Sequence, residues 1–519
     1  MTFAEKVDLL MIITNTSNSV LARSISIDAS AISRLRRGIR TPARNVTYLQ
    51  PMAEYFARNC RSEYQKAALY EALKNSTPPF YPAENESIDS IIYNWLCTDN
   101  KTAPDSLDEF MNDFIHFQFR KMPPVAAADI NQMAGYAVAE IETFYGKEGK
   151  QNAVLAFLSL VIKNEKPQTL LLYSDEDMEW LTDPKFRLKW ATLMVQVITQ
   201  GNRIKIIHSV TRNFDEMLAG IRQWVPLYMT GAIEPYYYPK TRDGLFRQTF
   251  FIAPETAAVT SSSVSNKTIN AANLLFTNKN MLGSLIEEFN DFLALCRPLM
   301  RIFTSRSRQE DYLLLLDEFE NETGDTIIKT DSFSDITMPP AVLESLLTRI
   351  SDPAPKRLLA YHLKRMENFK DHLAKYCFTE IFTLPEPELI WEGKVGVSFS
   401  DILNDTQIFY TPEEYIAHLK NIIDLLNTYE NYHIMITRDR HLDGSMIYVK
   451  EDIGVLVGKT LLPSIIFAIN ETNMTAAFWD YMNTILNKKP LSKNNRAQAM
   501  AELETLLNAL ELNLSKAIF

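Results

Sequence analysis

The spacing of apolar residues predicts two kinds of architecture in one chain. In the first 75 residues, apolar positions recur every three or four residues, which is typical of amphipathic helices. From about residue 148 onward, short apolar runs alternate with longer amphipathic stretches, as strands and helices do in α/β proteins. We therefore expect a multidomain protein with an all-α N-terminal domain, a helical linker and an α/β body.

The N-terminal pattern predicts short helices joined by a tight turn. A first helix begins near Thr2, because Thr2 and Glu5 have the spacing of a capping box. A second helix spans about 17–25 and a third about 29–37, and Gly38 is a typical residue after a helix C-terminus. The residues spaced to pack the second helix against the third are Leu21, Ala22, Ile25, Ile27, Ile32 and Leu35.

The body is predicted to contain two similar halves. Strands of the first half are expected at 169–173, 203–208, 249–253 and 257–262. In the second half, strands at 379–384 and 432–437 take the places of the first two, and a hairpin over 443–458 takes the place of the strand pair. Each half then has the order helix, strand, helix, strand, hairpin, helix, so we interpret the body as an internal repeat.

A Pro-rich stretch over 75–85 marks the first boundary between these parts. The expected segments are a helical domain over 1–75, a helical linker over 76–147, the first α/β half over 148–300, a connecting segment over 301–350, the second α/β half over 351–485 and a C-terminal helix over 486–519.

Charge separates the N-terminal part from the rest. The chain of 519 residues has a formal net charge of -11, yet residues 1–75 contain 11 Lys and Arg against 6 Asp and Glu, a net charge of +5. The remaining residues therefore carry -16. A small basic part on a large acidic body suggests a module that binds a polyanion, attached to a body that does not.

Several classes of protein are disfavoured by the sequence. No window has about 18 uninterrupted apolar residues, so we expect no membrane span. The first residues include Glu5, Lys6 and Asp8 within an amphipathic pattern, which does not fit a signal peptide. The four cysteines are far apart, and we expect reduced thiols in a cytoplasmic protein. The seven histidines are dispersed, so we expect no metal site.

The stretch from Leu21 to Pro42 resembles the helix-turn-helix of Xre/Cro-type bacterial and phage repressors. The matches are Leu21-Ala22, the run from Ile32 to Gly38, and Thr41-Pro42. The sequence departs from the family at Ser26, where Gly is usual in the turn, and at Arg36, where an acidic residue is common. The resemblance covers about 70 residues and implies that the third helix enters the major groove of double-stranded DNA.

Carried over to this chain, the resemblance implies two groups of DNA contacts. The residues that would face the bases or the adjacent backbone are Asp28, Ala29, Ser30, Ser33, Arg34 and Arg37. The residues that would meet phosphates are Arg36, Arg40 and Arg44. Arg can pair with the O6 and N7 atoms of guanine, whereas phosphate contacts position the domain without reading sequence. The structural alternative is a solvated basic face on a helical bundle.

The repeated body resembles the phospholipase D-like fold, in which two similar α/β halves face each other. Catalytic members need His-x-Lys-x4-Asp in each half, and this sequence lacks that motif. His362 with Lys364 and His418 with Lys420 have the His-x-Lys spacing, but both pairs fall in predicted helices without the required Asp. We therefore expect no enzymatic activity and no cofactor. The stretch 454–460 is one residue short of a phosphate-binding loop and is expected to be a strand.

Losing the catalytic residues would leave a cleft available for binding. The resemblance places this cleft at the carboxyl ends of the central strands of the two halves, and the expected lining is His208, Thr211, Arg212, Ser261, Arg438 and Arg440. These side chains suit a small anionic or sugar-like effector. An equally weighted alternative is that the arginines pair with the body's carboxylates.

Together these observations predict a cytoplasmic, sequence-specific transcriptional regulator whose body is a ligand sensor or an oligomerisation unit. We expect a homodimer, because one small head has a small DNA interface. Its contact surfaces are expected among the aromatic helices of 86–145 and the C-terminal helix. The alternatives are a DNA-associated enzyme with an unrecognised active site and a protein-interaction scaffold.

Overall fold

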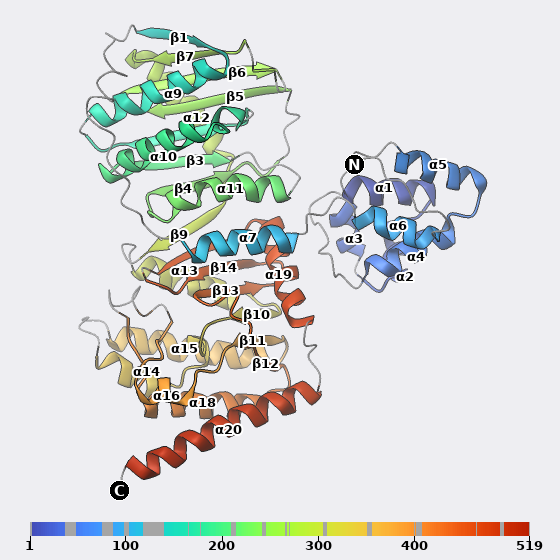
Figure 1. Cartoon of the computed structure of the whole chain (residues 1–519), viewed down its shortest axis with the longest axis vertical. Helices are drawn as coiled ribbons and strands as arrows, with labels where there is room; N and C mark the ends of the chain where they lie inside the picture. The colour runs from blue at the N-terminus through green and yellow to red at the C-terminus, as the bar shows by residue number, and fades with distance from the viewer. Residues whose placement is uncertain are drawn as a thin grey trace. The chain divides into compact units, whose positions relative to one another are not determined.

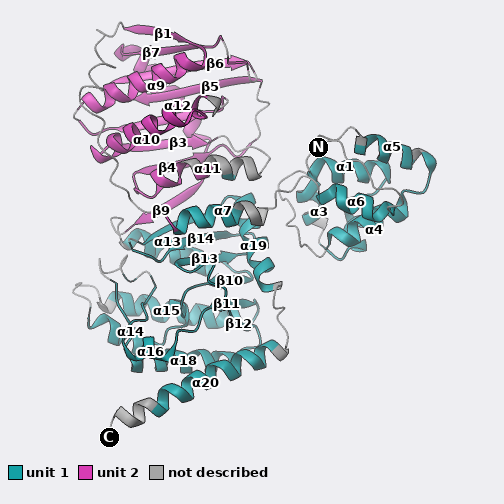
Figure 2. Ribbon diagram, in the orientation of Figure 1, with its two compact units in different colours: residues 1–115, 212–219, 305–519 teal, residues 116–211, 220–304 magenta. Residues whose placement is uncertain are grey.

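The computed structural model shows a multidomain protein with a helical N-terminal domain and mixed α/β sheets (Figure 1). The residues it describes are 3–27, 29–36, 48–74, 87–97, 103–117, 140–164, 166–176, 178–208, 214–240, 245–264, 267–268, 270–304, 309–349, 355–398, 400, 407–462, 464–487 and 493–517. The chain divides into two compact units (Figure 2). Unit 1 comprises 1–115, 212–219 and 305–519, and unit 2 comprises 116–211 and 220–304.

The helical domain of unit 1 has a single apolar core to which each of its helices contributes. The helices are α1 (Phe3–Ile13), α2 (Asn18–Ser24), α3 (Ala29–Arg36), α4 (Leu49–Asn59), α5 (Glu63–Lys74) and α6 (Ile88–Cys97). Lys6 of α1 is 1 % exposed and donates to the Trp95 carbonyl of α6 at 2.7 Å. The shared core therefore extends to α6, past the boundary predicted at residue 75.

Unit 2 is built on a mixed sheet whose strands pair in the order β1-β7-β6-β5-β2-β3-β4-β8. The strands are β1 (Ile141–Tyr145), β2 (Thr169–Ser174), β3 (Arg203–His208), β4 (Ile233–Tyr237), β5 (Phe246–Ala253), β6 (Ala257–Val264), β7 (Ala272–Phe276) and β8 (Arg297–Pro298). Strand β9 (Met300–Thr304) also falls within unit 2 but is not part of this sheet. The helices are α9 (Gly146–Lys163), η1 (Met178–Leu181), α10 (Pro184–Thr199) and α12 (Lys279–Ala294), and α11 (Phe214–Tyr228) belongs to unit 2 from residue 220 onward. Strands β2, β3 and β4 are parallel, and β5 is antiparallel to β2.

The sheet of unit 1 contains strands in the order β12-β11-β10-β13-β14-β15. They are β10 (Thr326–Lys329), β11 (Phe378–Phe382), β12 (Tyr432–Ile436), β13 (Ser445–Lys450), β14 (Gly454–Lys459) and β15 (Ile465–Ile469). The helices are α7 (Ala103–Ile115), α13 (Gln309–Asn321), η2 (Asp335–Thr337), α14 (Pro340–Leu347), α15 (Pro355–Leu373), α16 (Pro387–Trp391), α18 (Pro412–Thr428), α19 (Thr472–Asn487) and α20 (Lys493–Ala517).

The two sheets repeat one topology, but not in the alignment that the sequence suggested. In both, parallel strands with helical crossovers are followed by antiparallel strands, and β13 pairs with β10 as β5 pairs with β2. The first parallel strand of the second sheet is thus β10, which lies in the predicted connecting segment. The sequence alignment matched β2 with β11, whereas the topology matches β2 with β10 and β3 with β11.

The predicted linker and C-terminal helix are parts of these units. Phe110 and Phe114 of α7 contact Phe478 and Phe467, with ring centroids 6.4 and 4.9 Å apart, and β1 pairs with β7. Leu503 and Leu510 of α20 are fully buried. These apolar residues of the predicted dimer surfaces are therefore used within the chain, whereas Leu512 of α20 is exposed.

Arg496 links α20 to the body by capping the C-terminus of α18. Its guanidinium donates to the carbonyl oxygens of Leu426, Tyr429, Glu430 and Tyr432, at the C-terminus of α18 and in the strand that follows. The last carbonyls of a helix have no partner inside the helix, and a cation there also meets the negative end of the helix dipole.

Replacing Arg496 by Met should therefore lower the free energy of unfolding by about 2–3 kcal/mol, because carbonyl groups lose charge-assisted hydrogen bonds. The matched control is Lys420→Met, which removes an exposed ion pair between α18 and Glu511 of α20 and should cost less than about 1 kcal/mol. Urea unfolding followed by circular dichroism measures both. Equal effects of the two substitutions would contradict the capping role of Arg496.

Candidate nucleic-acid interface and ligand pocket

Helices α2 and α3 pack across a tight turn in the arrangement expected of a helix-turn-helix. Leu21, Ile32 and Leu35 are buried to within 1 %, so the apolar spacing noted in the sequence forms the helix–helix contact. Ser26 in the turn has a φ of 58°, the left-handed region that favours glycine. A Ser therefore holds a backbone conformation in this turn that is easier for Gly.

The polar edge of α3 presents Ser33 and Arg34, both of which are partly exposed. The Arg34 guanidinium donates to Asp452 Oδ1 at 2.8 Å, on the turn between β13 and β14. Arg36 instead reaches back within the domain, where it donates to Asp8 of α1 and to Asn18 Oδ1 of α2. Arg36 therefore links three helices, and a phosphate would have to compete with Asp8 for it.

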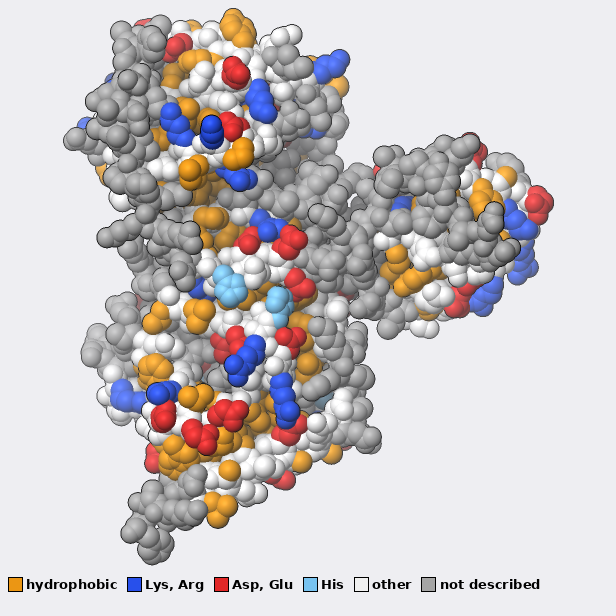
Figure 3. All heavy atoms as spheres, viewed as in Figure 1, with side chains coloured by type: hydrophobic (Ala, Val, Ile, Leu, Met, Phe, Trp, Pro, Cys, Tyr) orange, Lys and Arg blue, Asp and Glu red, His pale blue; other side chains and the backbone are white. Residues whose placement is uncertain are grey.

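The other predicted DNA contacts cannot be placed. Asp28, Arg37, Arg40 and Arg44 lie outside the described residues, and Ala29 and Ser30 are described only as backbone of α3. Figure 3 shows further Lys and Arg side chains at the edge of the helical domain near α4 and α5. Within these helices, Arg58 of α4 pairs with Glu54 and Lys66 of α5 pairs with Glu63.

His208, at the end of β3, is part of an aromatic cluster. Its Nε2 atom shares a hydrogen bond with the Tyr228 hydroxyl, and its ring contacts Trp224 edge to face. Burial lowers the pKa of His208 to about 4, so the ring is neutral at pH 7. The ring is partly buried among aromatic side chains, and its Nε2 atom is already used by Tyr228.

Ser261 belongs to a buried polar cluster at the carboxyl end of β2. Ser261 and Thr249 donate to Glu176 Oε2, and Lys150 of α9 donates to the same oxygen at 2.6 Å. Burial alone would raise the pKa of Glu176, but the Lys150 ammonium and these hydrogen bonds outweigh it and lower the pKa. The predicted ligand hydroxyl of Ser261 is thus used to hold a buried carboxylate.

The structure does not bring the remaining predicted pocket residues together into one site. Arg438 and Arg440 follow β12 in unit 1 and are exposed, whereas His208 and Ser261 belong to unit 2. Thr211 and Arg212 lie outside the described residues. In the topological repeat, the segment after β12 corresponds to the segment after β4, so Arg438 and Arg440 are not equivalents of the residues after β3.

Unit 1 contains a cavity that the sequence did not predict, between its sheet and helices α13, α14 and α15. This sheet-face cavity has about 1060 Å³ of space not filled by atoms, part of it open to solvent. The sheet contributes Ile328, Met446, Tyr448 and Leu456, and the helices contribute mainly leucines. Its polar side chains include Asp335, His362 and Arg365. A mostly apolar pocket with few polar groups is typical of small-molecule sites.

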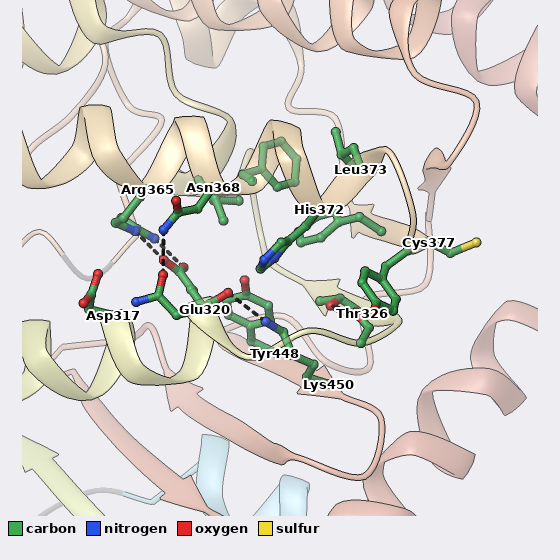
Figure 4. Close-up of a pocket in the computed structure, with 16 residues that line it drawn as sticks. Asp317, Glu320, Thr326, Arg365, Asn368, His372, Leu373, Cys377, Tyr448 and Lys450 are labelled. Carbon is green, nitrogen blue, oxygen red and sulfur yellow. Dashed lines mark hydrogen bonds and ion pairs between the residues drawn. The ribbon is translucent and has the colours of Figure 1, made fainter.

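Arg365 forms one wall of this cavity through a buried ion network. The Arg365 Nε and Nη2 atoms donate to both oxygens of Glu320 at 2.5 and 2.6 Å, and Nη1 donates to Asp335 Oδ2 at 2.9 Å. Figure 4 shows the far side of the network, where a smaller hollow is lined by Asn368, His372 and Lys450. An arginine on the apolar stripe of α15, beside Leu358, Met366 and Phe369, was the sequence signal of this network.

The His-x-Lys pairs of the second half lie in α15 and α18, as the sequence predicted, and both histidines are packed in the core. His362 Nε2 is 2.7 Å from the Met338 carbonyl oxygen. His418 is hydrogen-bonded to both Thr337 and Tyr410, and burial lowers its pKa to about 3. Both rings are therefore committed to structural hydrogen bonds.

Metal clusters, membrane-spanning helices and cysteines in the described part of the chain complete the inventory of possible sites. There, no group of three or more His, Cys, Asp or Glu side chains lies close enough to hold a metal ion. No helix in the described ranges is long and apolar enough to cross a membrane. Among the free cysteines, Cys60 is buried and Cys377 is exposed.

Comparison with known proteins does not assign this chain to a family. No protein-family model and no curated protein matches the chain. The archaeal chromatin protein TrmBL2, whose structure shows a novel mode of DNA binding, is 11% identical over 47% of this chain and 82% of its own, with a TM-score of 0.23. Polyphosphate kinase from Porphyromonas gingivalis is 11% identical over 87% of this chain and 60% of its own, also with a TM-score of 0.23. Similarities this low assign neither a fold nor a function.

The left-handed conformation of Ser26 can be tested by substituting a smaller and a larger residue at this position. Ser26→Gly should leave α2 and α3 as stable as before or up to about 1 kcal/mol more stable, whereas Ser26→Val should cost about 1–3 kcal/mol, because a β-branched residue is strained at positive φ. Ser19→Val, on the exposed side of α2, is the control. Hydrogen exchange of the α2 and α3 amides measures all three, and equal protection in the Gly and Val variants would contradict the left-handed turn.

The burial of His208 predicts a loss of stability in mild acid. Because the pKa is about 4 in the folded protein and about 6.5 in the unfolded chain, the stabilisation is present above pH 6.5 and is lost as the pH falls toward 4. Between pH 7 and pH 4.5 this loss is about 2 kcal/mol. The His208→Gln variant should lack this part of the pH dependence in urea unfolding followed by tryptophan fluorescence. An unchanged pH dependence would show that His208 is protonated in the folded state.

Proposed function

We propose that this chain is a sequence-specific DNA-binding regulator whose helix α3 enters the major groove. The observation that carries the proposal is the packing of α2 against α3 across the Ser26 turn, with Ser33 and Arg34 on the polar edge. An α-helix fits the major groove, and its exposed side chains can reach base edges there. The net charge of +5 on residues 1–75 supports the approach to a polyanion.

The contact between Arg34 and Asp452 is compatible with this role. The two side chains are 28% and 51% exposed, and an ion pair at that exposure contributes about 0–1 kcal/mol. A bidentate contact between arginine and guanine contributes about 1–3 kcal/mol of discrimination. DNA can therefore replace Asp452 as the partner of Arg34.

The body is proposed to act without catalysis, as a ligand sensor or an oligomerisation unit. The support is that His362 Nε2 and both ring nitrogens of His418 are used in buried hydrogen bonds. A homodimer remains part of the proposal, because two heads bound to two half-sites enlarge a small DNA interface. The cytoplasm is the compartment in which such a regulator would meet DNA.

The proposal can be tested with the full chain and a random duplex library. We expect selection to enrich one sequence motif, and Arg34→Ala to weaken binding to that motif about 5- to 150-fold by removing about 1–3 kcal/mol. The matched control is Arg58→Ala, which removes the same charge from α4 of the same domain. It should keep the motif and the preference for it.

The possible results separate the candidate functions. Loss of sequence preference in Arg34→Ala and not in Arg58→Ala supports major-groove reading by α3. Equal losses in both variants would reduce the role of the domain to general attraction of phosphates. Absence of any enriched motif would contradict the proposal, and cleavage or modification of the duplex would favour a DNA-associated enzyme instead.

A further inference from the structure

The sheet-face cavity of unit 1 combines an apolar interior with a half-exposed carboxylate. Its wall is formed by Leu313 and Leu316 of α13, Leu346 of α14 and Leu358 of α15, together with Ile328 and Leu456 of the sheet. A neighbouring hollow between α13 and α15 shares Leu313, Leu358 and Tyr361 with the cavity, so the apolar wall continues between the two helices. Space of this kind suits an elongated apolar molecule.

The charged side chains at the cavity differ in what they offer a ligand. Both oxygens of Glu320 accept hydrogen bonds from Arg365, but burial outweighs the guanidinium and raises the pKa of Glu320. The Nε, Nη1 and Nη2 atoms of Arg365 are all used by Glu320 and Asp335. Burial would also raise the pKa of Asp335, but there Arg365 outweighs it and lowers the pKa, so Asp335 is ionised. The ionised group that a ligand in the cavity can reach is therefore the Asp335 carboxylate.

The Asp335 carboxylate is the accessible member of the network. The Asp335 side chain is 51% exposed, whereas Arg365 and Glu320 are 5% and 7% exposed. His362, which also lines the cavity, has its pKa lowered by burial and is neutral at pH 7. The ammonium of Lys450 lies on the other side, where it donates to the carbonyl oxygens of Phe319, Glu320 and Glu322 at the end of α13.

We propose that the sheet-face cavity binds an apolar molecule that carries a cationic amine, with the amine on Asp335 and the apolar part against the leucines. A positive group at Asp335 would form a charge-assisted hydrogen bond with its exposed carboxylate, whereas a second carboxylate there would be repelled. This inference does not depend on DNA binding by α3, and it places a ligand site away from the residues predicted from the sequence.

The test uses three molecules of equal chain length: n-nonylamine, 1-nonanol and nonanoate. In isothermal titration calorimetry with the full chain, we expect n-nonylamine to bind at least about tenfold more tightly than 1-nonanol, because it adds a charge-assisted hydrogen bond, and nonanoate to bind more weakly than either. No saturable binding of any of the three would overturn the proposed site. Nonanoate binding as tightly as n-nonylamine would overturn the role of Asp335.

Variants locate the binding within the molecule. Asp335→Asn should bring n-nonylamine to the affinity of 1-nonanol while leaving 1-nonanol unchanged. Leu316→Trp should reduce the binding of both by filling the cavity. The matched control is Asp317→Asn, because Asp317 lies on α13 beside the neighbouring hollow and outside the cavity lining. Loss of amine preference in Asp317→Asn would overturn the assignment to Asp335. If a variant fails to fold, the order of the three molecules on the unaltered chain still decides the proposal.

Discussion

The buried ion network of Arg365 is the interaction around which the second sheet domain is organised. A charge taken out of water is very unfavourable unless it is paired and hydrogen-bonded, and Arg365 is 5% exposed. Its partners come from α13 and from η2, so one guanidinium from α15 joins a helix and the segment after β10. The network also separates the two hollows of this domain, since Arg365 lines both. Cavity shape and cavity charge therefore both depend on it.

Unit 2 contains a different buried ion pair near the end of its first parallel strand. There Glu176 lies just after β2 and the cation is Lys150 from α9, the helix before that strand, whereas Asp335 lies further from β10 and Arg365 comes from α15, the helix after β10. Thr249 and Ser261 of the sheet complete the contacts of Glu176. In unit 1, the sheet face under the network instead carries Ile328, Tyr448 and Leu456, which line the cavity. One topology thus supports a filled polar cluster in one unit and an apolar cavity in the other.

The sequence predicted the position of many strands of the body. It did not predict which strands of the two halves correspond, because that depends on how the strands pair. The strand at 203–208, the pair after residue 245 and the hairpin after residue 443 all form where apolar runs predicted them. The short strand β10 was missed because its four residues are bounded by polar stretches, and a helix–strand pair occurs more than once in each half. Only the antiparallel pairing of β13 with β10 shows which strands correspond. The predicted ligand residues were chosen by the shifted alignment.

The partners of charged side chains were also not predictable from the sequence, because the density of charged residues does not show which group each of them contacts. The apolar spacing of Leu21, Ile32 and Leu35 was sufficient to predict the packing of α2 on α3, since only one face of each helix can be buried. Nothing in the run of arginines distinguished Arg34, on the polar edge, from Arg36, whose partner Asp8 lies 28 residues earlier in the chain. Arg365 is the same case inside the body, because an arginine on an apolar stripe is either a buried ion pair or a residue at the rim of a pocket. Here it is both, which is why the contact that stabilises the fold also sets the chemistry of the cavity.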